Sequence, residues 1–217
     1  MQAQVFEDCI NGGWPSDATS LAAGGRGALA YAEAIRIFLA FAIDRSADRG
    51  STICSWDSSP KMEALRNTFA RQAIPMTWDF AEGNPFSDSS GNFLSNVDWV
   101  ARVVELLVPA AIGYVAQHDA QTVDYPDQVV ISSDPPYYDN IEYSDLSDFF
   151  YVWLKRNCGT VFPDVFGFVS TPKLEELVAT SALTHSDAAG NLSSLARIEA
   201  ADAFQTNGLG LALCSAR

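Results

Sequence analysis

The feature that most constrains this 217-residue chain is an abrupt change of residue type near its middle. The β-branched run Val129-Val130-Ile131 is followed, after two serines, by the tetrad Asp134-Pro135-Pro136-Tyr137. Valine and isoleucine favour strands, whereas two consecutive prolines end one. The pattern therefore predicts a strand whose carboxyl end carries a carboxylate, a rigid backbone and an aromatic ring. In open α/β sheets, ligands bind outside that end of the strands.

Hydrophobic periodicity predicts helices on both sides of the tetrad. Apolar residues recur at helical spacing over residues 28–48, 95–108 and 144–156. Ser59-Pro60 and Thr171-Pro172 are each typical of a helix start, whereas residues 113–117 and 129–133 have the composition of strands. We therefore expect an α/β fold with a mainly helical region before about residue 110.

The composition indicates a folded protein without a membrane segment. Hydrophobic residues make up 48% of the chain, which is enough for a core, yet no stretch approaches the roughly 20 apolar residues of a membrane helix. The first ten residues carry acids where a secretory signal would carry lysines. We expect a soluble protein located in the cytoplasm.

The cysteines and acids do not have the spacing of a metal site. Four cysteines are scattered without a C-x-x-C pair, and there are only two histidines, so we expect neither a zinc site nor a disulfide scaffold. Four acids lie within residues 139–148, but Asp145 and Asp148 are explained by the start of a helix. We predict no bound metal.

The residues around the tetrad resemble a known enzyme family. Residues 138–154, with residues 68–86 and 113–120, look like a group of prokaryotic adenine-specific DNA methylases of the amino-methyltransferase superfamily. These are long proteins that carry a domain of unknown function, and the resemblance covers roughly residues 25 to 180. It implies a partial Rossmann-like methyltransferase sheet, incomplete relative to the family, and transfer of a methyl group from S-adenosylmethionine to the exocyclic amine of adenine in DNA.

The tetrad has the groups that this chemistry requires. The Asp134 carboxylate and the Pro135 carbonyl can each accept one N–H of the amine, and Pro136 restricts the residue before it. A base must leave the duplex to reach such a pocket, and Tyr137 offers a ring for it to stack on. Tyr138 either assists or packs. The alternative is that the tetrad is an ordinary turn after a strand.

Other features of the family are missing or open to two interpretations. The match assigns Asp119 a place near the adenine moiety of S-adenosylmethionine, although it can equally be a surface carboxylate. The glycine-rich donor loop of the superfamily is absent from the sequence. A net charge of −14 provides no surplus of basic residues for DNA phosphates. We therefore expect a fragment, a truncated product or one piece of a split enzyme, which contacts DNA through regions largely absent from this chain.

These interpretations define four regions and two competing functions. The regions are a loop-rich lead over 1–27, a mainly helical region over 28–110, part of the catalytic domain over 111–185 and a poorly ordered tail over 186–217. The first function is a segment of a DNA adenine-N6 methyltransferase that is inactive in isolation and relies on an upstream donor-binding segment or subunit. The alternative is a non-catalytic acidic interaction module or remnant. A methyltransferase acting on cytosine, RNA or a small amine shares the tetrad chemistry.

Overall fold

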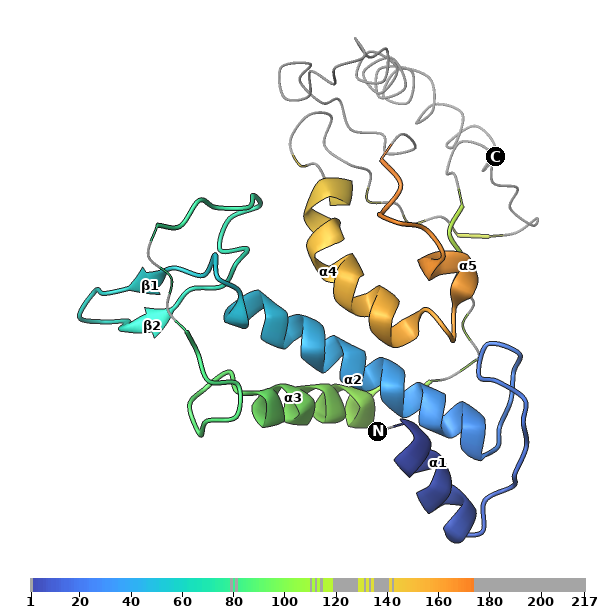
Figure 1. Cartoon of the computed structure of the whole chain (residues 1–217). Helices are drawn as coiled ribbons and strands as arrows, with labels where there is room; N and C mark the ends of the chain where they lie inside the picture. The colour runs from blue at the N-terminus through green and yellow to red at the C-terminus, as the bar shows by residue number, and fades with distance from the viewer. Residues whose placement is uncertain are drawn as a thin grey trace, which may run out of the picture. The chain divides into compact units, whose positions relative to one another are not determined.

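The computed structural model describes the N-terminal region almost completely and the middle of the chain in part. The described residues are 2–78, 80, 82–109, 111, 113, 115–118, 129–130, 132, 134, 141 and 143–173. They form helices and one small antiparallel sheet, which is a mixed α/β composition (Figure 1). The chain divides into one unit of Met1–Ile112 with Asp148–Val169 and a second of Gly113–Ser147 with Ser170–Arg217.

Helix α2 (Ala28–Gly50) is the centre of the first unit, and its presence confirms the helix predicted over 28–48. Helices α1 (Gln2–Asn11) and α3 (Phe93–Leu106) both pack against α2 (Figure 1). Small side chains at a helix contact allow close approach. The buried side chains of α2 are therefore mainly alanines, whereas the larger apolar residues of the predicted stripe, such as Phe38 and Ile43, are only half-buried.

Helix α1 lies inside the region that the sequence predicts to be a loop-rich lead, so that prediction is wrong for residues 2–11. The turn residues after it end the helix rather than exclude one. Gly13 has a φ of +82°, and the Trp14 amide donates to the Cys9 carbonyl at 3.0 Å. A left-handed glycine in this position is a common helix end. Residues 12–27 do form a loop, and the buried Glu33 carboxylate accepts the Leu21 amide at 2.6 Å.

The helix predicted from Ser59-Pro60 is also wrong, because this segment forms a β-hairpin. Strands β1 (Trp56–Asp57) and β2 (Ala64–Leu65) pair antiparallel, with Trp56 opposite Leu65. The Asp57 carboxylate accepts the Ser59 amide at 3.0 Å and pairs with Arg66 at 2.9 Å. Such an Asx turn suits the same Asp, Ser and Pro residues that a helix start would use.

Helix α3 confirms the helix predicted over 95–108, but it begins earlier. Its N-cap is Asn92, whose side chain accepts the Ser95 amide at 2.8 Å. Asn96 is only 2% exposed and donates through Nδ2 to Ser46 Oγ of α2 at 2.9 Å. Asn96 therefore joins α3 to α2 through a buried hydrogen bond, and the apolar residues at the end of α3 are exposed.

Helix α4 (Tyr143–Cys158) confirms the helix predicted after the tetrad. Within the first unit, Phe149 and Phe150 of α4 both contact the Phe69 ring, with centroids 5.3 Å apart in each pair. The short helix α5 (Pro163–Phe166) follows, and the Phe168 carbonyl after it accepts hydrogen bonds from Tyr151 and Lys155 of α4. No helix in the described part of the chain is long and apolar enough to cross a bilayer.

The described residues of the two predicted strands, 113–117 and 129–133, are not in strands, so the prediction is wrong for these positions. Val130 is 99% exposed, and Val115 is almost as exposed. A single strand has no partner for its backbone groups, and β propensity chiefly reflects packing against neighbours. At the described positions, the apolar runs alone therefore do not produce strands.

Candidate functional site

Asp134 is the residue of the predicted catalytic tetrad that the structure describes. It is exposed and lies in irregular backbone, four residues after the fully exposed Val130. Its carboxylate has no hydrogen bond or ion pair to another described residue. The group is therefore accessible to a ligand. The other predicted site residues lie outside the described part: Pro135, Pro136, Tyr137, Tyr138 and Asp119.

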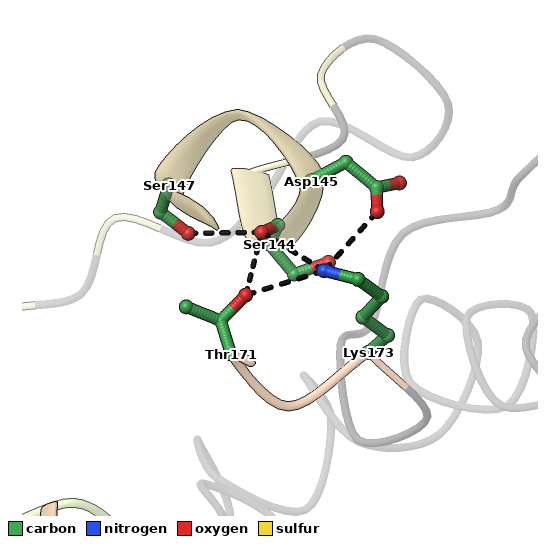
Figure 2. Close-up of polar contacts among 5 residues, drawn as sticks. All are labelled: Ser144, Asp145, Ser147, Thr171 and Lys173. Carbon is green, nitrogen blue, oxygen red and sulfur yellow. Dashed lines mark hydrogen bonds and ion pairs between the residues drawn. The ribbon is translucent and has the colours of Figure 1, made fainter. Parts of the chain in front are cut away.

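The first turn of α4, the helix that follows the tetrad, is held by a polar cluster in the second unit (Figure 2). The buried Ser144 places its carbonyl oxygen at the centre of the cluster. Thr171 Oγ1 donates to this oxygen at 2.6 Å, and Lys173 Nζ donates at 3.2 Å. Two side chains from residues 171–173 therefore bind one backbone carbonyl of α4.

An ion pair adds to the same cluster. Lys173 Nζ lies 3.2 Å from Asp145 Oδ1, and both side chains are about one-third exposed (Figure 2). A pair of this exposure is worth up to about 1 kcal/mol, so its main effect is on orientation. Asp145 was expected only as a first-turn acid. Thr171-Pro172 was expected to begin a short helix through Leu174 and Leu177; residues 171–173 are not helical, and the rest of that segment lies outside the described residues.

A second set of titratable groups lies in the first unit, where α2 and the end of α4 contribute Asp44 and Cys158. Burial raises the pKa of Asp44 to about 6, and its Oδ1 atom is buried without a hydrogen bond. Burial also raises the pKa of the Cys158 thiol, with the Arg36 guanidinium opposing this effect and the Asp44 carboxylate adding to it. A buried thiol with a raised pKa is a poor nucleophile. These groups therefore affect stability rather than catalysis.

Asp44 should make the folded protein less stable at neutral pH. Its folded pKa of about 6 exceeds the ordinary 3.8, so folding favours the protonated form. The stabilisation that protonated Asp44 gives to the folded state is fully present below pH 3.8 and is lost as the pH rises through 6. We expect Asp44→Asn to raise the free energy of unfolding at pH 7 and to leave it nearly unchanged at pH 3.5. Urea denaturation at the two pH values measures this, with the exposed Asp88→Asn as the control. A destabilised Asp44→Asn protein at pH 7 would contradict the account.

Neither the side chains that could bind a metal nor the comparisons with known proteins assign a function to the described residues. No group of three or more His, Cys, Asp or Glu side chains that could hold a metal ion occurs among the residues that the structure describes. No protein-family model, curated protein or solved structure matches this chain.

Proposed function

We propose that this chain is the part of an S-adenosylmethionine-dependent DNA adenine-N6 methyltransferase that binds the target adenine. The observation that carries the proposal is the Asp-Pro-Pro-Tyr tetrad between an apolar run and an amphipathic helix. The exposure of Asp134 supports it, because a carboxylate that must bind a substrate amine has to be accessible. The hydrogen bonds from Thr171 and Lys173 to the Ser144 carbonyl support it further, because they fix the first turn of the helix that follows the tetrad.

The tetrad would act by orienting the amine. The lone pair of an aromatic amine is delocalised into the ring, so the nitrogen is a weak nucleophile until it is held near tetrahedral geometry. The Asp134 carboxylate and the Pro135 carbonyl would each accept one N–H, which leaves the lone pair free on the opposite side. The negative charge of Asp134 would also stabilise the positive charge that develops on nitrogen. Tyr137, and Tyr138 if it assists, would stack on the flipped base.

The methyl group would come from S-adenosylmethionine, whose sulfonium makes the methyl carbon electrophilic. Asp119 is the residue of this chain assigned to that cofactor, and it lies outside the described residues. Further donor-binding groups would come from an upstream segment or subunit. Exposed apolar side chains such as Val130, Leu106 and Val108 support this, because an incomplete sheet and its helices leave such surface uncovered.

The test is methyl transfer from labelled S-adenosylmethionine to unmethylated DNA. We expect little or no transfer by the 217-residue chain alone, and transfer when it is co-expressed with the polypeptide encoded directly upstream. Titration with S-adenosylmethionine should show binding only to the combined protein. If the combined protein neither binds the donor nor modifies DNA, the proposal is wrong.

The alternative function is an acidic interaction module. It is favoured by the net charge of −14, which repels nucleic acid, and by the exposed apolar end of α3. This alternative predicts no binding of S-adenosylmethionine with or without the upstream polypeptide. The same titration therefore separates the two functions.

A further inference from the structure

A cleft in the first unit is lined by no residue of the tetrad and is not used by the chemistry above. Its volume is about 270 Å³, and it is formed by the C-terminal end of α2, the β1–β2 hairpin and residues 83–92. This volume is just below the range of about 300–1,000 Å³ typical of small-ligand sites. The residues that give the cleft its chemical character are Arg49, Trp56, Glu63, Asn84 and Gly91.

Arg49 is a half-buried cation in the last turn of α2. Its guanidinium has no hydrogen bond or ion pair to another described residue. The neighbouring Asp48 carboxylate is already occupied, since it accepts Asn67 Nδ2 at 2.8 Å and the Phe69 amide at 3.2 Å. Arginine binds carboxylates and phosphates through two parallel hydrogen bonds. Arg49 is therefore suited to an anion that enters the cleft.

Gly91 allows the loop to lie directly against this guanidinium. Its φ is +85°, and a Cβ atom at this position would lie 2.5 Å from Arg49 Nη1. Any larger residue would be strained and would displace Arg49. The Gly91 carbonyl is itself held by Asn96 Nδ2 at 3.3 Å, which connects the loop to α3. The loop that lies against the Arg49 guanidinium is therefore anchored to α3.

Trp56 supplies an aromatic surface in the same cleft. Its side chain is 53% exposed and belongs to β1. An accessible indole can stack on a nucleobase, and such stacking is worth about 1–3 kcal/mol. Asn84 Oδ1 accepts the Phe86 amide at 3.0 Å, and its Nδ2 can donate to a base edge. Glu63 is the acid in the lining and opposes an anion, so its carboxylate should weaken binding.

We infer that this cleft binds a nucleotide, with its phosphate on Arg49 and its base on Trp56. The inference deepens the proposed function, on which it rests, by giving a strongly acidic chain a local contact for nucleic acid. The shared chemistry is a phosphate next to a flat heterocycle. The nucleotide belongs either to a DNA strand or to a free mononucleotide.

Tryptophan fluorescence of the full chain can follow binding of adenosine monophosphate, adenosine and a short single-stranded oligonucleotide. We expect the monophosphate to quench the fluorescence saturably and adenosine to bind at least about tenfold more weakly. Arg49→Gln should weaken monophosphate binding by about tenfold or more, and Gly91→Ala should weaken it through displacement of Arg49. Glu63→Gln should tighten it. Trp56→Phe should remove most of the quenching, which assigns the signal to this cleft.

The matched control is Arg71→Gln, which removes an exposed arginine that does not line the cleft. It should leave binding unchanged. Because the test follows binding in this cleft rather than methyl transfer, failure here is distinguishable from failure of the proposed function. Competition between oligonucleotide and monophosphate identifies a nucleic-acid site, whereas binding of the monophosphate alone identifies a free nucleotide. Absence of binding, equal binding of adenosine, or unchanged binding by Arg49→Gln would each overturn the inference.

Discussion

Replacement of Asp134 by asparagine is expected to reduce the rate of methyl transfer by about a hundredfold or more in the protein that contains both the donor-binding segment and this chain. Asparagine keeps one acceptor oxygen but loses the negative charge. Asp134→Ala loses both, so it should be slower still. A single-turnover assay with labelled donor measures the methylation step directly, without interference from product release.

The control for this pair is Asp164→Asn, which removes a carboxylate of similar exposure from α5. It should retain the full single-turnover rate. Asp134 is exposed and has no hydrogen bond to another described residue, so its replacement should leave the unfolding midpoint unchanged. Full activity of Asp134→Ala would show that this carboxylate does not orient the amine.

Replacement of Phe69 by alanine is expected to give a large loss of stability. The Phe69 ring contacts both Phe149 and Phe150 of α4, and those two rings lie 5.1 Å from each other. Removal of a phenylalanine from a packed cluster typically costs about 3–5 kcal/mol. Because Phe69 is half-buried, we expect a loss of about 2–3 kcal/mol in the free energy of unfolding. Urea denaturation followed by circular dichroism measures this value.

Two further variants test whether the ring contacts cause the effect. Phe69→Leu keeps most of the volume and should recover more than half of the loss. Phe86→Ala removes an exposed ring from the neighbouring loop and should change stability by less than about 0.5 kcal/mol. If Phe69→Ala loses no more stability than Phe86→Ala, the aromatic cluster does not hold α4 in place.

Helices with strong periodicity could be predicted from this sequence, whereas short elements could not. Apolar residues at helical spacing over 144–156 predicted α4, and those over 28–48 predicted α2. The hairpin at 56–65 was missed because Ser59-Pro60 suits a turn as well as a helix start. The contact between Asn96 and Ser46 was missed because it joins residues 50 positions apart. Periodicity reports which face is apolar, not which polar group crosses a helix interface.

The role of the tetrad stays a prediction from residue types. A carboxylate, a proline carbonyl and a tyrosine ring after an apolar run are groups that could hold an aromatic amine. The hydrogen bonds from Thr171 and Lys173 to the Ser144 carbonyl could not be predicted, because these residues are far from Ser144 in the sequence. Arg49 was not identified either. Arg49 stands out because its guanidinium has no hydrogen bond or ion pair to another described residue and because Gly91 lies against it. Neither feature can be read from the sequence.

The identity of the modified nucleoside tests the central claim most directly. DNA treated with S-adenosylmethionine and the combined protein would be digested to nucleosides and analysed by mass spectrometry, with the Asp134→Ala protein as the blank. The account predicts N6-methyladenine in the sample and none in the blank. Methyl groups on a ring carbon, such as 5-methylcytosine, would contradict it, because the proposed role of the tetrad is to orient an exocyclic amine. DNA that remains unmodified would contradict it equally.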